Sequence, residues 1–309
     1  MKKFVRVIGL IIAVLMLAGT LAGCNPAVER ERAIAVKREG YTFEDLLEDY
    51  HNPAGRSLVI AHRADFVNFP ENSLEAIESC IEMGVDMVEL DIRKSADGVW
   101  VLSHDQSLFR TTNGMGMVEN KTAEELKQLR LKKGKGGFSA LTDYKMPTFA
   151  EALEACRGRI LINLDKISFE HKDEVYDILS EHDAVNCAIF KFSASPEQIR
   201  EWFDTLSAQG KPLPLYSPKI RGNTYKEAAE KLASYQGLSS MAEIMYRGSA
   251  EQTKKLNALA NECGMRAMRT TLLVTNDYEQ AWQRALSMGF NALMTNKPAN
   301  MIVFINELD

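Results

Sequence analysis

From Ser57 onward, short apolar segments alternate with amphipathic helical patterns such as NSLEAIESCIEMG and YEQAWQRALSMGF. Each apolar segment has the length of a single β-strand. This alternation is typical of an α/β fold with a parallel sheet, because parallel strands require long crossover connections. The pattern predicts eight strands, at residues 57–63, 87–93, 159–166, 187–192, 213–220, 241–247, 265–272 and 291–298.

Eight strands with intervening helices fit a (β/α)₈ barrel, or TIM barrel, whose usual size is about 250 residues. An open, doubly wound sheet is the alternative. Such a sheet does not need eight strands, and no glycine-rich nucleotide-binding loop follows the first strand here. We therefore predict one barrel domain over residues 57–309.

The stretch after the second strand interrupts the alternation. Asp97-Gly98 lies between two apolar runs, which predicts a β-hairpin that folds back over the barrel. Residues 106–147 then form a predicted insertion. It contains a short helix with Thr122 as N-cap and Glu125 three residues later, and a basic, glycine-rich segment, KKGKGG. The insertion is either a wall of the active site or a spacer without a role in the chemistry.

Residues 1–24 have a different character from the rest of the chain. A basic start precedes the apolar run from Ile8 to Leu17, and small residues then lead to Cys24. The run is short for a transmembrane anchor, which is the alternative interpretation. The pattern resembles a bacterial lipoprotein signal, 1–23, that is cleaved before a lipidated Cys24. Residues 24–56 would then be a tether and a short helix, and the protein would be held at a membrane surface in the cell envelope, outside the cytoplasm.

The overall composition narrows the function classes. Hydrophobic residues make up 46% of the chain and charged residues 26%, a normal globular balance. The formal net charge of -5 becomes -8 once the three basic residues of 1–23 are removed, which argues against a nucleic-acid partner. Five scattered cysteines are too few for a disulfide scaffold or a structural zinc site.

Carboxylates gather where the second and third strands end, and barrel active sites lie at such carboxyl ends. Glu89 and Asp91 are two residues apart on one strand and therefore share a face. If that face is the barrel interior, their burial calls for a cation, and Asp165 offers a third oxygen ligand. The alternative is a surface pair, with Val88 and Leu90 facing inward.

Two of the five histidines, His62 and His104, also fall at these ends, beside charged residues. An imidazole titrates near neutral pH and can act as an acid or a base. Two of them could therefore activate the attacking oxygen and protonate the leaving oxygen at a phosphorus centre. Arg63 and Lys166 add positive charge for a phosphoryl group.

The ordered motifs AHRADF, PENS, ELDIRKSADG, SHD and RTTNG resemble the signature region of the glycerophosphodiester phosphodiesterase family, and weaker similarity extends over about 57–300. The resemblance implies a (β/α)₈ barrel. It also implies that the substrate is a small-molecule glycerophosphodiester or lysophospholipid. Hydrolysis of a glycerophosphodiester would give sn-glycerol 3-phosphate and an alcohol. The resemblance also implies residue roles: His62 and His104 as the acid/base pair, Glu89, Asp91 and Asp165 as ligands of one Ca²⁺ or Mg²⁺, and Arg63 and Lys166 as phosphate contacts.

Two positions depart from the family pattern. Ala64 replaces the glycine of His-Arg-Gly, and its β-carbon disfavours a positive φ angle. Asp165 stands where much of the family has Glu-x-Lys, so its position along the strand differs, and Asn163 on the same face is a possible substitute contact.

Four further residues are weaker candidates. Asn72 is predicted to be the N-cap of the helix that follows it, and Glu71 could face the site. Lys191 and Glu243, near the ends of the fourth and sixth strands, either line the pocket or form a local ion pair.

Two other functions stay open at this point. Related phospholipase D-like enzymes use a similar histidine pair and cation but cyclise the phosphodiester instead of hydrolysing it. A non-catalytic binding lipoprotein on a barrel scaffold is the third interpretation, and Ala64 and the shifted Asp165 are its only support. The sequence does not identify the leaving alcohol.

Overall fold

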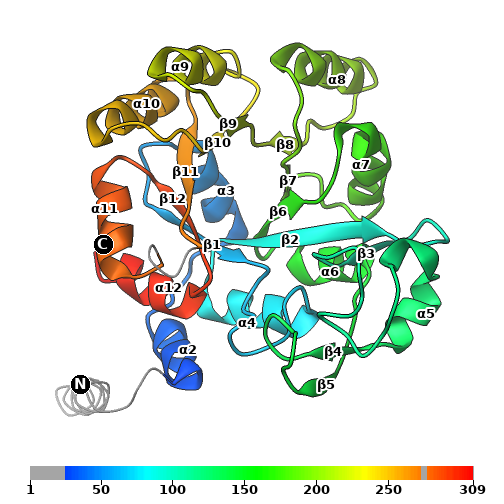
Figure 1. Ribbon diagram of the computed structural model, residues 1–309. Coiled ribbons are helices and arrows are strands. Elements are labelled where there is room, and N and C mark those ends of the chain that lie inside the picture. Colours follow the sequence, from blue (N-terminus) through cyan, green and yellow to red (C-terminus); the bar gives the residue numbers. More distant parts are fainter. Residues whose placement is uncertain (1–24, 273–276, 309) are drawn as a thin grey trace, which may run out of the picture.

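The computed structural model describes residues 25–272 and 277–308. Figure 1 shows strands curled around a centre, with helices outside them. The predicted signal segment and Cys24 lie outside the described residues, so the lipid anchor stays a prediction. Within the described ranges, no helix is long and apolar enough to span a membrane.

The strands form one curled sheet in which neighbours pair in parallel along the order β8-β7-β6-β2-β1-β12-β11-β10-β9. Every predicted strand segment contributes to this sheet, and the predicted (β/α)₈ barrel is confirmed. The bounds are β1 (Leu58–His62), β2 (Met87–Lys94), β6 (Leu161–Asp165), β7 (Ala188–Phe190), β8 (Leu215–Tyr216), β9 (Lys219–Ile220), β10 (Met241–Ile244), β11 (Arg266–Thr270) and β12 (Ala292–Thr295).

The ring of strands closes within the segment that was predicted to be one strand. Segment 213–220 is divided at Ser217 and Pro218, so that β8 pairs with β7 and β9 pairs with β10. Proline has no N–H to donate, which interrupts a continuous ladder. Backbone bonds bridge the break: Ser217 donates to the carbonyl of Phe190 at 2.9 Å, and Glu243 donates to that of Pro218 at 2.9 Å. The two edge strands are therefore joined by the chain itself.

Helices surround the ring and follow the strands in the order that the alternating pattern predicts (Figure 1). Their bounds are α2 (Pro26–Ala35), α3 (Phe43–His51), α4 (Leu74–Met83), α5 (Ala123–Gln128), α6 (Phe149–Cys156), α7 (Lys172–Glu181), α8 (Pro196–Ala208), α9 (Tyr225–Ala233), α10 (Ala250–Glu262), α11 (Glu279–Ser287) and α12 (Pro298–Asn306).

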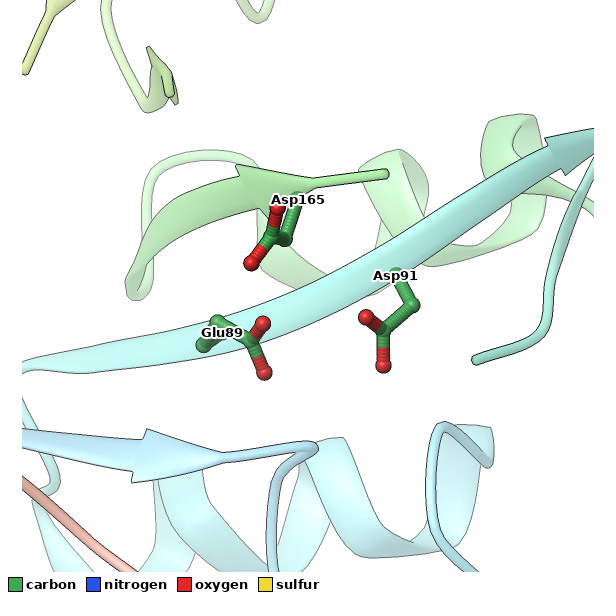
Figure 2. Close-up of side chains that lie close together, drawn as sticks. All are labelled: Glu89, Asp91 and Asp165. Atoms are coloured by element: carbon green, nitrogen blue, oxygen red, sulfur yellow. The ribbon is translucent and has the colours of Figure 1, made fainter. Parts of the chain in front are cut away.

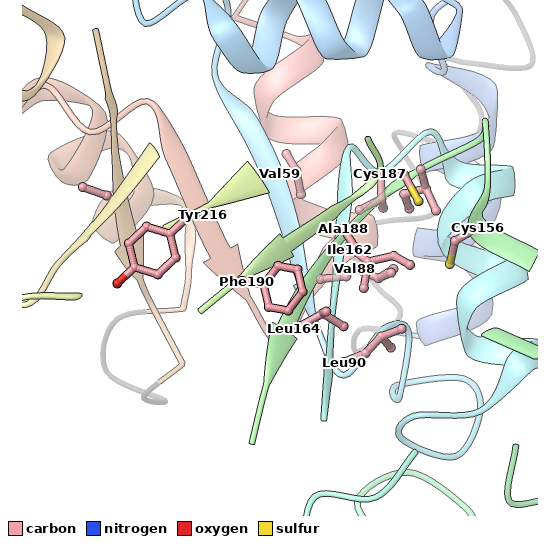
Figure 3. Packing of buried hydrophobic residues seen from close by; sticks show 14 of the residues in the cluster. Val59, Val88, Leu90, Cys156, Ile162, Leu164, Cys187, Ala188, Phe190 and Tyr216 are labelled. Atoms are coloured by element: carbon pink, nitrogen blue, oxygen red, sulfur yellow. The ribbon is translucent and has the colours of Figure 1, made fainter. Parts of the chain in front are cut away.

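Alternate residues of each strand belong to two separate apolar cores. The outer core lies between strands and helices, and Figure 3 shows Val59, Val88, Leu90 and Ile162 within it. Val88 and Leu90 thus face the helices, which rules out the interpretation of Glu89 and Asp91 as a surface pair. The inner core fills the barrel with Leu58, Ile60, Met87, Leu161, Ile189, Met241 and Met268, and Leu46 and Tyr50 of α3 close its amino-terminal end.

The segment predicted to be a tether contains a packed helix. α2 contacts α4 and α12, and its Ala33 is fully buried. Arg30 donates a hydrogen bond to Ser79 at 2.8 Å and pairs with Glu82, both on α4. Residues 26–35 are therefore part of the outer layer of the barrel, and of the two N-terminal helices only α3 was predicted.

The predicted hairpin is confirmed, since β2 pairs antiparallel with β3 (Trp100–Leu102). Beyond it, residues 106–147 contain the 3₁₀ turn η1 (Val118–Asn120), helix α5, and the pair β4 (Arg130–Lys132) and β5 (Leu141–Lys145). Helix α5 begins at Thr122, which forms the predicted capping box with Glu125. This region has its own small apolar core, and its limits as an insertion stay a prediction.

Arg266 joins α3 to the barrel. Its guanidinium is fully buried and donates to the backbone carbonyls of Asp49, Asn52 (2.7 Å), Arg56 (2.7 Å) and Asn291 (3.0 Å). Asp49 and Asn52 lie at the carboxyl end of α3, where each carbonyl accepts one backbone N–H of the following turn in addition to the guanidinium. Burial lowers the pKa of Arg266 to about 10, so the guanidinium stays charged at neutral pH.

Replacing this guanidinium should cost much of the stability of the fold. Arg266→Met removes the guanidinium bonds to four backbone carbonyls, of which that of Arg56 accepts no other bond among the described residues, and should lower the free energy of unfolding by about 3 kcal/mol. Arg200→Met, on the exposed surface of α8, is the matched control and should change it by less than about 0.5 kcal/mol. Urea denaturation of both variants measures the difference. Equal stability of the two variants would contradict the role of Arg266.

Candidate active site

The inward-facing residues become polar at the carboxyl ends of the strands. Figure 2 shows Glu89 and Asp91 of β2 and Asp165 of β6 directed into one space. One oxygen of each carboxylate lies within 4.8 Å of the other two. Asp165 stands directly opposite Asp91 in the β2–β6 ladder, so its position on the strand does bring it to the cluster. Asn163 stands beside Glu89 in the same ladder, one step deeper in the barrel.

The carboxylates repel one another in a buried setting. Burial, with Asp91 as the second cause, raises the pKa of Glu89 to about 8. Burial likewise raises the pKa of Asp91. Asp165 differs: burial acts to raise its pKa, but the ammonium groups of Lys191 and Lys219 outweigh it and lower the pKa to about 2. The cluster as a whole is therefore short of positive charge.

His62 lies beside Glu89, with 4.0 Å between its Nε2 and Oε2 of the carboxylate. Its other ring nitrogen, Nδ1, is 2.8 Å from Oδ1 of Asn296. The amide nitrogen of Asn296 donates to the carbonyl of Leu272 at 2.8 Å, which leaves Oδ1 to accept from the ring. Burial and the nearby Arg63 lower the pKa of His62 to about 3. The ring is therefore neutral, with a lone pair on Nε2 that can accept a proton.

His104 has a carboxylate partner instead of an amide. Its Nδ1 is 2.6 Å from Oδ1 of Asp105, and the other oxygen of Asp105 accepts from Nε of Arg110 at 2.5 Å. His104 is close enough to Asp91 to oppose the rise in the pKa of that carboxyl. His62 thus lies beside Glu89, whereas His104 acts through its charge on Asp91.

Two arginines share the buried carboxylate of Glu71. Arg63 donates to its Oε2 at 3.0 Å, and Arg110 donates to its Oε1 at 2.6 Å. Arg63 also places Nε 3.4 Å from Asp91. Glu71 therefore holds the predicted phosphate contact Arg63 at the cluster and connects it, through Arg110 and Asp105, to His104.

The backbone around the site is left-handed at several non-glycine residues. Among the described residues, five have a positive φ angle, and four of them belong to the site: Arg63 (56°), Ala64 (60°), Asn72 (57°) and Lys166 (63°). Each costs about 1–2 kcal/mol in a residue that has a β-carbon. Ala64 is fully buried and has a conformation that glycine adopts easily, which the alanine takes in spite of its β-carbon.

Asn72 was predicted to cap α4, and that prediction is wrong. The N-cap is Ser73, whose hydroxyl accepts from the backbone of Ala76 at 3.2 Å. The amide of Asn72 instead donates to Oδ2 of Asp91 at 3.0 Å, and the backbone N–H of Asp91 donates to Asn72 at 3.2 Å. A left-handed backbone turns the side chain of Asn72 toward β2, where it fixes the carboxylate of Asp91.

The remaining candidates lie around Asp165. The ammonium group of Lys191 is buried, 3.2 Å from Asp165 and 4.0 Å from Glu243, so these residues both line the barrel mouth and form an ion pair. Glu243 also accepts from Thr270 at 3.0 Å. Lys166 is exposed at the rim, and its backbone N–H donates to Asp165 at 2.8 Å.

Sequence reasoning missed three contributors. Lys219 and Asn296 lie near the carboxyl ends of the predicted strands LPLYSPKI and NALMTNKP. That position was the only feature of the sequence that could have pointed to them. Arg110 belongs to the Arg-Thr-Thr motif, but Glu71, its partner, is 39 residues away, and no local pattern indicates such a pair.

The family model for the glycerophosphoryl diester phosphodiesterase family matches residues 62–300. The chain belongs to this family. The glycerophosphodiester phosphodiesterase of Caldanaerobacter subterraneus is 38% identical over 111 residues, which are 36% of this chain and 45% of that protein. Human glycerophosphodiester phosphodiesterase 1 is 38% identical over 121 residues, 39% of this chain and 37% of the human protein. The chain thus matches less than half the length of these relatives.

Solved structures of the family agree with the barrel over most of the chain. A glycerophosphoryl diester phosphodiesterase from Parabacteroides distasonis has a TM-score of 0.68 at 22% identity, covering 87% of this chain and 93% of that one. An Oleispira antarctica phosphodiesterase, solved in complex with the product sn-glycerol-3-phosphate, has a TM-score of 0.59 at 22% identity, covering 81% of this chain and 97% of that one.

Removing the guanidinium of Arg110 should weaken the network that holds His104. Arg110→Gln should lower the free energy of unfolding by about 1–2 kcal/mol at pH 7, because the buried Glu71 loses a partner while solvent partly screens Arg110. The hydrogen bond from Arg110 is the main reason why the pKa of Asp105 is lowered to about 2. That part of the stability is present above about pH 4 and is lost as pH falls toward 2.

The difference between wild type and Arg110→Gln should therefore shrink on acidification below pH 4, as followed by urea denaturation. Arg130→Gln is the control, because Arg130 pairs with Asp143, whose side chain is 98% exposed. It should change the stability by less than about 0.5 kcal/mol. An equal loss in both variants would show that the Glu71 network contributes no more than a surface pair.

Proposed function

We propose that the chain is a metal-dependent phosphodiesterase that hydrolyses glycerophosphodiesters to sn-glycerol 3-phosphate and an alcohol. The observation that carries this proposal is a pair of histidines beside a cluster of three carboxylates at the barrel mouth, with His62 4.0 Å from Glu89 and His104 near enough to act on the charge of Asp91. Family membership supports it, as does the sn-glycerol-3-phosphate held by the Oleispira antarctica relative.

Glu89, Asp91 and Asp165 fit one hard divalent cation, Ca²⁺ or Mg²⁺, because both prefer carboxylate oxygens. Burial first, and the neighbouring charge of Asp91 second, raise the pKa of Glu89, and a bound cation would offset both. When bound, the cation supplies charge to neutralise the phosphoryl oxygens and to polarise the phosphorus. The amide of Asn72 and the guanidinium of Arg63 hold Asp91 in place for this role.

The two histidines are set up for opposite proton transfers. His62, neutral and held through Nδ1 by Asn296, accepts a proton at Nε2 from the attacking water. Water oxygen bonds to phosphorus, and the bond from phosphorus to the alcohol oxygen breaks. His104, oriented through Nδ1 by Asp105, donates a proton to that leaving oxygen. Arg63 and Lys166 bind the phosphoryl oxygens during the exchange.

The purified protein should release glycerol 3-phosphate from glycerophosphocholine or a related diester. His62→Ala and His104→Ala should each lower kcat by at least about a hundredfold, because each removes one proton transfer. His182→Ala, on a partly exposed histidine at the end of α7, is the control and should retain full activity. Phosphorus NMR identifies the product. Full turnover by either site variant would rule out the two-histidine mechanism, and a cyclic phosphate would favour the cyclising reaction.

Removal of the cation should abolish this activity, and Ca²⁺ or Mg²⁺ should restore it. Calorimetric titration of the EDTA-treated protein should show one bound cation per chain. Glu89→Gln or Asp91→Asn should weaken that binding by at least about tenfold, since each removes a charged oxygen ligand. Asp143→Asn is the control, because its side chain is 98% exposed on β5, away from the cluster. Undiminished binding in the site variants would place the cation elsewhere.

A further inference from the structure

The region 106–147 exposes large aromatic side chains that the proposed reaction does not use. Of the phenylalanines in the described ranges, only Phe109 and Phe138 are exposed, at 60% and 110% of the reference area. Burial of a phenylalanine is worth about 1.5–3 kcal/mol, so the exposure of two in one region calls for an explanation.

These phenylalanines lie together with lysines in one patch. The ammonium group of Lys132 is 5.0 Å from the ring centre of Phe109, and it donates to the carbonyls of Phe109 (2.8 Å) and Gly137 (3.2 Å). Phe138 follows Gly137 directly in the chain. We call Phe109, Lys132, Lys133, Lys135 and Phe138 the rim patch.

Glycines hold this loop in a fixed shape. Gly136 has a φ angle of 74°, and a β-carbon there would stand 2.1 Å from the carbonyl oxygen of Arg110. The N–H of Gly137 donates to that same carbonyl at 2.6 Å. The loop is thus fastened to Arg110 of the active-site network, and the next residue, Phe138, extends into solvent from a fixed base.

The rim patch borders the entrance of the active site. Lys135 lies 4.5 Å from the ring centre of Phe66, and its ammonium group is 3.4 Å from Oδ1 of Asn296, which holds His62. The carbonyl of Gly134 accepts from the backbone of Glu71 at 2.9 Å. Whatever binds the rim patch is therefore presented directly to the catalytic groups.

The charge of this region is opposite to that of the whole chain. Residues 106–147 contain eight basic and four acidic side chains, and residues 130–137 contain four basic and no acidic ones, whereas the chain carries a formal net charge of -5. The patch therefore attracts anions even though the protein as a whole repels them.

We propose that the rim patch docks the mouth of the active site onto an anionic lipid surface. Lysines near such a surface contribute about 1 kcal/mol each, and aromatic side chains favour the boundary between lipid headgroups and acyl chains. A soluble polyanion would be bound by the lysines alone and gives no reason to expose Phe109 and Phe138. A neutral bilayer gives no reason to concentrate lysines beside them.

Docking in this way narrows the substrate class, a consequence that rests on the proposed function. The phosphodiester would belong to a lipid with its headgroup at the surface, such as a lysophospholipid, and would enter the barrel mouth from the membrane. The rim patch would also orient the barrel, independently of how the N-terminal segment is attached.

A fluorescent label beside Phe138 tests the docking without requiring turnover. The full chain with Cys24→Ser carries Ser139→Cys, labelled with an environment-sensitive fluorophore, because the other cysteines are buried. Vesicles of phosphatidylcholine and phosphatidylglycerol at roughly 3:1 should shift its emission to the blue, and vesicles of phosphatidylcholine alone should not. The same label at Ser207→Cys, exposed at the end of α8, should show no shift.

Matched variants separate the two contributions. Phe138→Ser should remove the blue shift, and Lys132→Gln with Lys133→Gln should raise the vesicle concentration at half-maximal shift about tenfold or more. Leu213→Ser, which removes an exposed apolar side chain from another part of the surface, should have no effect. All variants should melt as wild type and retain turnover of a water-soluble diester, which shows that neither the fold nor the proposed function is disturbed.

Three outcomes would overturn the proposal. They are no shift with anionic vesicles, a shift unchanged by Phe138→Ser, and an equal shift with dextran sulfate in the absence of lipid, which would identify a soluble polyanion as the ligand. Loss of activity on every diester would instead overturn the proposed function and leave the vesicle result standing.

Discussion

Three carboxylates share a small buried space at the mouth of the barrel, and the surrounding structure is organised to tolerate them. Their mutual repulsion in a poorly solvated setting is costly unless positive charge or donors oppose it. Lys191 and Lys219 approach Asp165 from one side, and Arg63 and Asn72 hold Asp91 from the other. Glu89 accepts the backbone N–H of Arg63 at 3.1 Å, and burial raises its pKa to about 8.

The two histidines beside these carboxylates have different hydrogen-bond partners. A neutral amide fixes His62, and a carboxylate fixes His104. The amide of Asn296 acts to raise the pKa of His62, but burial outweighs it and lowers that pKa to about 3. Burial, more than the partner, therefore keeps His62 neutral, the state from which it accepts a proton in the proposed mechanism.

Features that follow from local alternation were predictable from the sequence. The repeating apolar segments predicted the barrel, and the two-residue period of a strand predicted that Glu89 and Asp91 share a face. Features that depend on distant partners were not. Asn72 precedes a helix in the manner of a cap, but contact with Asp91 and a left-handed backbone determine its role. The packing of α2 depends on Ser79 and Glu82, and the pairing of Glu71 with Arg110 joins segments that no local pattern connects.

The division of one strand at Ser217 and Pro218 has a consequence for how the barrel moves. Every other junction of the ring is a ladder between two strands, but β8 and β9 each contribute only two residues, and a proline stands near their junction. The ladders on either side of this seam each pair only two residues, so thermal opening of the ring should begin there. Lys219 and Glu243 lie beside it, on the wall opposite β1. Opening of this seam would therefore widen the barrel mouth on the side of the lysine ammonium groups. It would leave β1 and β2, with His62 and Glu89, in place.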